Sequence, residues 1–82
     1  MLSIEYDSKF LSIIKKIKNQ ADKEKVKKHI KKIIETPEIG KPMKFARKGT
    51  REVYISPYRL SYVYIKEEDK LIFLDLYHKD EQ

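Results

Sequence analysis

The sequence predicts a small α+β domain of order β-α-α-β-β-β, in which an N-terminal strand and a helical hairpin pack on a small antiparallel sheet. Its length of 82 residues leaves room for one hydrophobic core, so residues 1–82 are expected to form a single domain. The first half carries isoleucine stripes at helical spacing, whereas the second half holds three runs dense in β-branched and aromatic residues. The face of the sheet away from the helices is expected to stay free.

The N-terminal residues have the alternation of a half-buried strand. Leu2, Ile4 and Tyr6 alternate with the polar residues Ser3 and Glu5. A period of two places the three apolar side chains on one face, so the first element is predicted to be a strand.

Two helices are predicted next. Asp7 or Ser8 can cap the first helix, and Asp22 can cap the second after a break at residues 19–22. The apolar stripes of the two helices consist of Phe10, Ile13, Ile14 and Ile17 and of Val26, Ile30, Ile33 and Ile34. These stripes are expected to face the core, and the short connection predicts an antiparallel hairpin. The lysines expected to face outward are Lys23, Lys27, Lys28, Lys31 and Lys32.

The second half is predicted to be a three-stranded meander. Pro37, Gly40 and Pro42 end the helical half, because proline and glycine interrupt helices. The three apolar runs cover residues 51–56, 59–65 and 71–78 and are separated by turn segments at 56–58 and 66–70. Such short turns predict two tight hairpins between antiparallel strands.

Positive charge is concentrated in one part of the chain. Residues 15–48 carry thirteen Lys/Arg and four Asp/Glu, a net charge of +9, while the whole chain has a net charge of +6. Such a field attracts a polyanion and speeds the encounter with it, which indicates a nucleic-acid partner. Lysine-rich surfaces are also typical of heat-adapted proteins, so the helix lysines alone leave both interpretations open.

The arginines give a more specific signal. Sixteen of the nineteen basic residues are lysine, yet Arg47, Arg51 and Arg59 all lie within one stretch of thirteen residues. Arginine binds phosphate through a planar, bidentate fork that lysine lacks. Clustered arginine therefore indicates a phosphate-binding site.

The sequence predicts a soluble, cytoplasmic protein without cofactor or metal. It contains no cysteine, so neither disulfides nor a thiolate metal site are expected, and a reducing compartment fits best. No apolar run approaches the roughly 20 residues of a membrane span, and the first residues lack the pattern of a signal peptide.

Three motifs carry a resemblance to a known family. They are Gly40-Lys41-Pro42-Met43-Lys44 before the meander, Tyr58-Arg59-Leu60-Ser61-Tyr62 on its middle strand, and His78-Lys79-Asp80 at its end. In this order and at these spacings, the chain resembles the RelE/ParE toxin superfamily, and specifically its RelE-like ribonuclease branch. The resemblance implies a type II toxin that cleaves messenger RNA at the ribosome without a metal and is neutralised by a cognate, small, acidic, partly disordered antitoxin.

The resemblance also implies site residues. Cleavage of RNA without a metal requires a base for the 2′-hydroxyl, a cation for the crowded phosphate and an acid for the leaving oxygen. Arg59 matches the family's phosphate-stabilising arginine, although it could instead form a structural pair with Glu52 or Asp75. Arg51 is a second candidate, but alternation places it with Val53 and Ile55, where it could contact backbone instead.

The remaining catalytic candidates lie at the chain's end. His78 can exchange a proton near neutral pH or serve as a structural histidine. Lys79 matches the family's next basic position, where it can hold a phosphate as a point charge.

Other residues are candidates for binding RNA. Lys44, Arg47 and Lys48 are expected to contact the RNA backbone, or else to form a solvated basic loop. Tyr54 and Tyr58 are candidates for stacking on a base.

The chain departs from its relatives in one respect. Many relatives carry a tyrosine on a C-terminal extension as a general base or stacking platform, and this sequence ends at Gln82 without one. Glu52 is then a candidate base. Two alternative functions stay open, a gyrase-inhibiting ParE-like toxin and a non-catalytic module that binds RNA through the same basic face.

Overall fold

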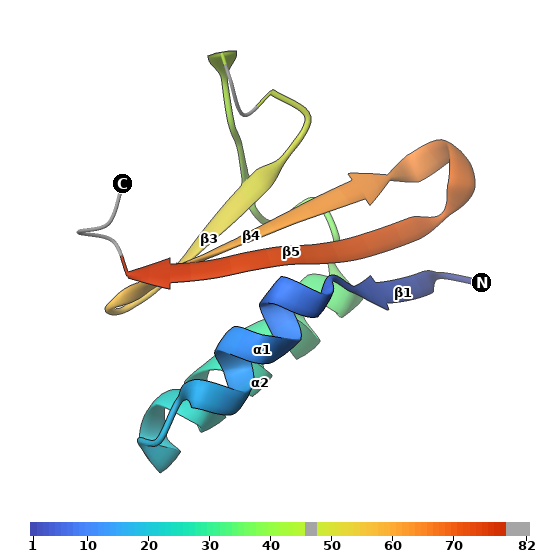
Figure 1. Ribbon diagram of the computed structural model, residues 1–82. Coiled ribbons are helices and arrows are strands. Elements are labelled where there is room, and N and C mark those ends of the chain that lie inside the picture. The colour runs from blue at the N-terminus through green and yellow to red at the C-terminus, as the bar shows by residue number, and fades with distance from the viewer. Residues whose placement is uncertain (46–47, 79–82) are drawn as a thin grey trace.

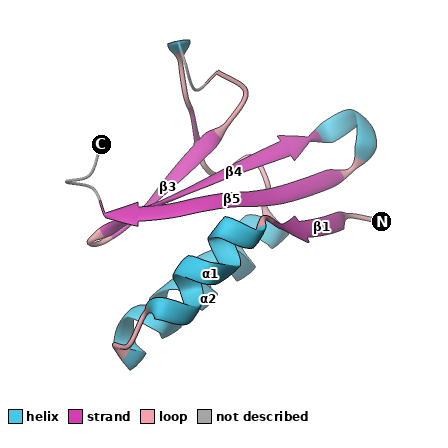
Figure 2. Cartoon of the chain, viewed as in Figure 1, coloured by secondary structure: helices cyan, strands magenta, loops and turns pink. Residues whose placement is uncertain are grey.

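The chain folds into a mixed sheet with a helical hairpin on one face. The computed structural model describes residues 1–45 and 48–78. Within these residues the elements are β1 (Ser3–Tyr6), α1 (Ser8–Lys16), α2 (Gln20–Glu35), β2 (Lys41–Pro42), β3 (Arg51–Ile55), β4 (Tyr58–Ile65), a 3₁₀ turn (Lys66–Glu68) and β5 (Lys70–His78). Figures 1 and 2 show both helices on the same side of the strands.

The strand order is β1-β5-β4-β3-β2 in the part of the chain that the structure describes. The α+β class and the antiparallel meander of β3, β4 and β5 are confirmed. The sheet is not wholly antiparallel, however, because β1 pairs with β5 in parallel. Turns fix the direction only of strands that a hairpin joins. β1 instead reaches its neighbour through the helices and the rest of the sheet.

The N-terminal cap of α1 is the predicted one, whereas that of α2 is a different residue. Asp7 caps α1 as predicted, since its side chain accepts a hydrogen bond from the Lys9 N–H at 2.9 Å. The prediction that Asp22 caps α2 is wrong, because Asn19 accepts from the Asp22 N–H at 3.1 Å and the helix begins at Gln20. Asp22 instead lies in the first turn, where its negative charge suits the helix dipole.

The core lies between the hairpin and the sheet. Its buried side chains are Phe10, Ile17, Val26, Ile33, Ile55, Leu60, Tyr62, Leu71, Phe73 and Leu76. Both predicted helical stripes contribute, and the rings of Phe10 and Phe73 stack with centroids 5.5 Å apart. None of the helices in residues 1–45 and 48–78 is long and apolar enough to span a membrane.

A bulge in β5 changes which side chains face the helices. Opposite β4, Leu60 pairs with Leu76 and Tyr62 pairs with Phe73, so β5 holds one residue more than β4 over this span. Phe73 and Leu76 therefore both face the core although they are three residues apart. As a consequence, Tyr77 is turned to the side of the sheet opposite the helices.

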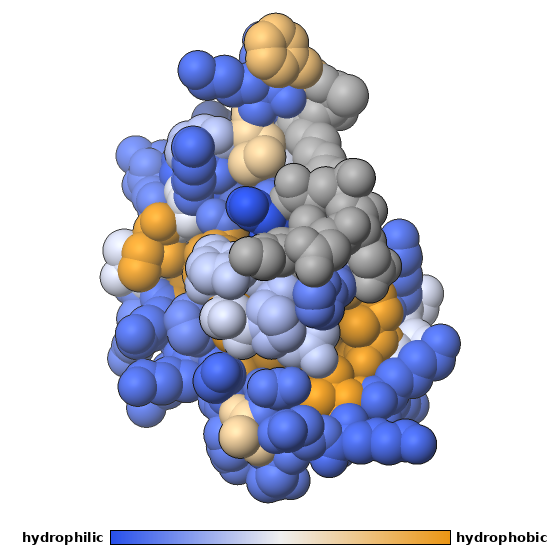
Figure 3. All heavy atoms as spheres, turned by 90° about the vertical axis from the view of Figure 1, so that its left-hand side faces the viewer, coloured by the Kyte–Doolittle hydropathy of each residue, from blue (hydrophilic) through white to orange (hydrophobic). Residues whose placement is uncertain are grey.

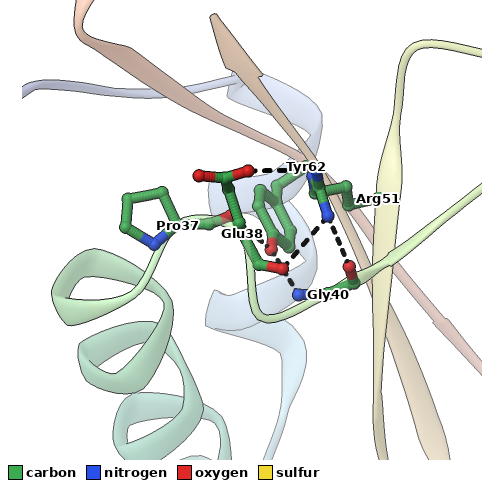
Figure 4. Close-up of polar contacts among 5 residues, drawn as sticks. All are labelled: Pro37, Glu38, Gly40, Arg51 and Tyr62. Carbon is green, nitrogen blue, oxygen red and sulfur yellow. Dashed lines mark hydrogen bonds and ion pairs between the residues drawn. The ribbon is translucent and has the colours of Figure 1, made fainter. Parts of the chain in front are cut away.

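A buried tyrosine fixes the segment that follows α2. The hydroxyl of Tyr62 accepts a hydrogen bond from the Gly40 N–H at 2.8 Å and donates one to the Pro37 carbonyl at 2.8 Å. Arg51 Nη1 donates to the carbonyls of Glu38 at 3.1 Å and Gly40 at 2.9 Å, as Figure 4 shows. Burial raises the pKa of the Tyr62 phenol, so the hydroxyl keeps the proton that it donates.

Gly40→Ala is expected to destabilise the fold by about 3 kcal/mol, at the upper end of the cost of overpacking. An added Cβ would lie 2.6 Å from the hydroxyl and 2.8 Å from a ring carbon of Tyr62, which is fully buried and held by two hydrogen bonds. Urea unfolding at constant slope measures the difference.

Gly49→Ala is the matched control. Gly49 has a φ of +98°, and no atom of the described residues lies within 4 Å of an added Cβ, so backbone strain of about 1 kcal/mol is expected there. Equal losses at the two glycines would show that contact with Tyr62 is not what requires Gly40.

Candidate functional site

The face of the sheet away from the helices, here called the open face, carries two rows of functional side chains. Residues directly opposite in neighbouring strands share a face. The first row crosses β3, β4 and β5 and consists of Tyr54, Arg59 and Tyr77. The second row crosses β2, β3, β4 and β5 and consists of Lys41, Glu52, Ser61 and Asp75.

Glu52 is the buried charged residue of this face. Its side chain is only 4 % exposed, and it accepts a hydrogen bond from the hydroxyl of Tyr77. Arg59 Nη1 lies 3.9 Å from Glu52 Oε1, which makes an ion pair. A buried carboxylate needs such partners to remain charged. Glu52, Tyr54, Arg59 and Tyr77 are together called the open-face cluster.

Arg59 is held in place but keeps contact with solvent. Its side chain is 37 % exposed, and its guanidinium carbon lies 5.8 Å from the centroid of the Tyr54 ring. Its Nε is buried and has no hydrogen-bond acceptor among the described residues. Because its contact with Glu52 is longer than a hydrogen bond, the guanidinium keeps donors for an incoming phosphate.

A hollow of about 330 Å³ adjoins the cluster at Tyr77. Its other lining residues are Asp7, Lys9, Thr50, Ser61, Leu74 and Asp75. Lys9 Nζ forms an ion pair with Asp75 at 3.2 Å, so the hollow carries both charges. Its volume is at the low end for ligand sites. In residues 1–45 and 48–78, no group of His, Asp and Glu side chains is arranged to hold a metal ion.

The balance of charge on this face differs from the expectation of a basic face. The two rows contain two basic residues, Lys41 and Arg59, and two acidic residues, Glu52 and Asp75. The lysines of α1 and α2 belong to the hairpin, which packs on the other side of the sheet (Figure 1). Positive charge is therefore concentrated on the hairpin, and the open face combines both signs.

The sequence from residue 4 to residue 82 matches the model of a known family, the ParE toxin of the type II toxin–antitoxin system parDE. The chain belongs to this family. The resemblance to the RelE/ParE toxins expected from the three motifs is thereby confirmed. No curated protein sequence matches the chain at a significant level.

Solved structures share the toxin's fold at low sequence identity. RelE in the intact RelBE toxin–antitoxin complex of E. coli is 20 % identical with a TM-score of 0.76, over 93 % of this chain and 94 % of that one. A chain of the RelBE2 toxin–antitoxin complex of Mycobacterium tuberculosis is 19 % identical with a TM-score of 0.79, over 95 % of this chain and 98 % of that one. The YoeB/ParE toxin of Agrobacterium tumefaciens is 15 % identical with a TM-score of 0.81, over 94 % of this chain and 98 % of that one.

In this toxin Arg51 does not join the open-face cluster. It shares a face with Val53 and Ile55, as alternation predicts, and this is the face that packs against the helices. Its guanidinium binds backbone carbonyls at Glu38 and Gly40. The structure thus places Arg51 in the alternative position, as a group that holds the linker between α2 and β3.

His78 also lies apart from Arg59. It is opposite Tyr58 in the β4–β5 pair, and their rings meet edge to face with centroids 6.1 Å apart. The Tyr58 hydroxyl reaches Asp22 of α2 at 3.5 Å. Burial, and secondarily the negative charge of Asp22, raises the pKa of Tyr58. His78 is thus brought to Tyr58 and the helix side, whereas Arg59 is opposite Tyr77.

The other predicted residues are distributed over the loop and the cluster. Lys44 and Lys48 are exposed in the loop between β2 and β3, and Tyr54 is half exposed beside Arg59. Arg47 and Lys79 lie outside the described residues.

Sequence reasoning missed Tyr77 entirely. Simple alternation from Leu71 and Phe73 assigns Tyr77 to the buried face, and only the bulge reverses this. The signal in the sequence was Asp75, a charged residue where alternation from Leu71 and Phe73 requires a buried one.

Proposed function

We propose that this toxin is a metal-independent endoribonuclease that cleaves messenger RNA at the ribosome and is neutralised by a cognate antitoxin. The observation that carries the proposal is the open-face cluster, in which a buried carboxylate lies 3.9 Å from an arginine that keeps contact with solvent. A tyrosine hydroxyl is bound to the same carboxylate. A base, a cation and a proton donor are thus assembled on the open face.

Each group has a role in attack by the 2′-hydroxyl on the adjacent phosphate. Glu52 accepts the proton of the 2′-hydroxyl as the new O–P bond forms. Arg59 binds the oxygens of the crowded phosphate, whose charge grows in the transition state. Tyr77 protonates the leaving 5′-oxygen as the old O–P bond breaks, and the proton on Glu52 returns to Tyr77 along their hydrogen bond. The products are a 2′,3′-cyclic phosphate and a 5′-hydroxyl.

The lysines of the hairpin support the proposal from another side of the molecule. Within the hairpin, residues 15–35 carry nine Lys and three Asp/Glu, a net charge of +6, and Figure 3 shows hydrophilic side chains around the lower part of the molecule, where the hairpin lies. A ribosome presents an extended surface of phosphates, so this charge favours docking there. Docking and cleavage then use different faces.

Induced expression with and without the antitoxin tests the proposal. Primer extension on cellular transcripts should show cuts in translated regions that disappear when the antitoxin is present. Intact transcripts together with supercoiling defects would instead establish the second candidate, inhibition of gyrase, which the match to the ParE family favours. An absence of toxicity would favour a non-catalytic RNA-binding module.

The antitoxin is proposed to be acidic and to dock in a groove between the two helices. This groove has a volume of about 260 Å³. It is lined by Ile14, Lys15, Ile17, Lys23, Val26, Lys27 and Ile30. Its apolar floor suits the apolar side of a helix or strand that folds on binding, and its lysine rim suits a partner of opposite charge.

Reversing the charge of the rim is expected to weaken the complex. Lys15→Glu combined with Lys27→Glu should lower the association rate at least tenfold at low salt, because rim charges act mainly on encounter. Surface plasmon resonance with the antitoxin measures this rate. The matched control, Lys28→Glu with Lys31→Glu, changes exposed lysines that do not line the groove. Equal effects of both pairs would show that only net charge matters and would contradict docking in the groove.

A further inference from the structure

Phe45 combines an almost fully exposed side chain with an unfavourable backbone conformation. Among large hydrophobic residues of the described chain, its exposed fraction of 91 % is exceeded only by that of Met1. Its backbone has a φ of +58°, a conformation that bulky residues rarely adopt. Exposure and an unfavourable backbone both cost stability, so an outward phenyl ring at this place requires a reason.

The loop around Phe45 is tied by backbone hydrogen bonds. The Met43 N–H donates to the Thr50 carbonyl at 3.0 Å, and the Lys48 N–H donates to the Phe45 carbonyl at 3.0 Å. The two bonds join residues 43 and 45 to residues 50 and 48. The exposed ring therefore stands on a backbone that is held by hydrogen bonds on both sides of Lys44.

Phe45 also borders a hollow of about 290 Å³. The other lining residues are Lys41, Pro42, Met43 and Lys44. Its described walls thus combine an aromatic ring and apolar atoms with two ammonium groups, without a carboxylate from any residue that the structure describes. A nucleotide has the complementary composition, because its base stacks on aromatic and apolar surfaces and its phosphate pairs with cations.

The hollow lies next to the open-face cluster. Lys41 is directly opposite Glu52 in the β2–β3 pair, so both belong to the open face. Arg59 is on β4, two strands from β2, which corresponds to about 10 Å. Figure 1 shows the loop between β2 and β3 rising on the side of the sheet away from the helices. A single strand bound at Arg59 can therefore continue into the hollow.

We propose that this hollow binds one nucleotide of single-stranded RNA, with its base stacked on Phe45 and its phosphate held by Lys41 and Lys44. The site deepens the proposed ribonuclease function, on which it rests for the choice of RNA as the bound strand. It is a second contact with the substrate, separate from the groups that carry the reaction.

The absence of tryptophan from the sequence provides a direct probe. Phe45→Trp introduces a single indole, whose fluorescence should be quenched when a base stacks on it. The probe is a 2′-O-methyl RNA oligonucleotide, which lacks the attacking hydroxyl and stays intact. Phe45→Ala should raise its Kd roughly 5- to 100-fold, the range expected for one lost stack, while Phe45→Trp retains affinity.

Two further variants separate stacking from general effects. Ile39→Ala removes an apolar side chain that is 53 % exposed and does not line the hollow, so its Kd should equal that of the wild type. Phe45→Asn suits a positive φ, so it should weaken binding without lowering the melting temperature. A fall in melting temperature that accompanies the loss of binding would assign Phe45 a structural role and overturn the proposal.

The remaining outcomes distinguish this site from the proposed reaction. If Phe45→Ala weakens oligonucleotide binding but the wild type cuts no RNA, the nucleotide site stands and the ribonuclease function fails. Equal affinity for single-stranded and duplex RNA, or an unchanged Kd in Phe45→Ala, overturns the site. If Phe45→Ala binds RNA as the wild type does but no longer forms the antitoxin complex, Phe45 anchors a protein partner instead.

Discussion

Arg59→Ala is expected to lower the rate of RNA cleavage by about 10²–10³, the cost of removing one preorganised charge stabiliser. The guanidinium is held by the ring of Tyr54 and by Glu52 while its side chain stays 37 % exposed, so it can meet a phosphate without rearrangement. Single-turnover cleavage of a ribosome-bound transcript measures the loss, and growth arrest on induction reports it in cells.

Two variants serve as controls for this result. Arg59→Lys should restore little activity, because lysine lacks the planar fork. Arg51→Ala removes an equally charged residue that binds the backbone at Glu38 and Gly40. Arg51→Ala should lower the free energy of unfolding. At a temperature where the variant remains folded, its cleavage rate should stay close to that of the wild type. Undiminished growth arrest in Arg59→Ala would remove Arg59 from the mechanism.

Glu52→Gln is expected to lower the cleavage rate by about 10²–10⁴, the usual contribution of a positioned general base. The amide has the same shape as the carboxylate and still offers an oxygen to the Tyr77 hydroxyl, but it accepts no proton. Circular dichroism should show an unchanged fold, and single-turnover cleavage should show the loss.

Asp75→Asn is the matched control for Glu52→Gln. Asp75 lies in the same row of the open face and pairs with Lys9 at 3.2 Å rather than with Arg59. Its neutralisation should change the rate by less than about tenfold. If both variants lose activity equally, the charge of the face rather than the proton acceptor at Glu52 determines the rate.

A double-mutant cycle joins the two main predictions. Glu52 and Arg59 are in contact at 3.9 Å, and groups that act in one step lose little more when both are removed. The rate of the double variant should therefore be close to that of the slower single variant. Fully multiplicative losses would indicate that the two residues act independently.

Much of the fold and part of the site are predictable from local patterns. The stripe of Ile30, Ile33 and Ile34 places α2 on the core because its spacing matches one helix face. Alternation places Tyr54 and Glu52 opposite Val53, because neighbours in a strand point to opposite faces. These inferences succeed because each depends only on the backbone geometry of one element.

The sequence by itself determined the class, the order of all elements except the two-residue strand β2, the core stripes and the family motifs around Arg59. Only the tertiary structure decided the parallel pairing of β1 with β5 and the side on which His78 and Tyr77 lie. The bulge in β5 adds one residue to a strand, and one residue reverses the face of every side chain beyond it. Register belongs to a pair of strands, so the partner strand is needed to fix it.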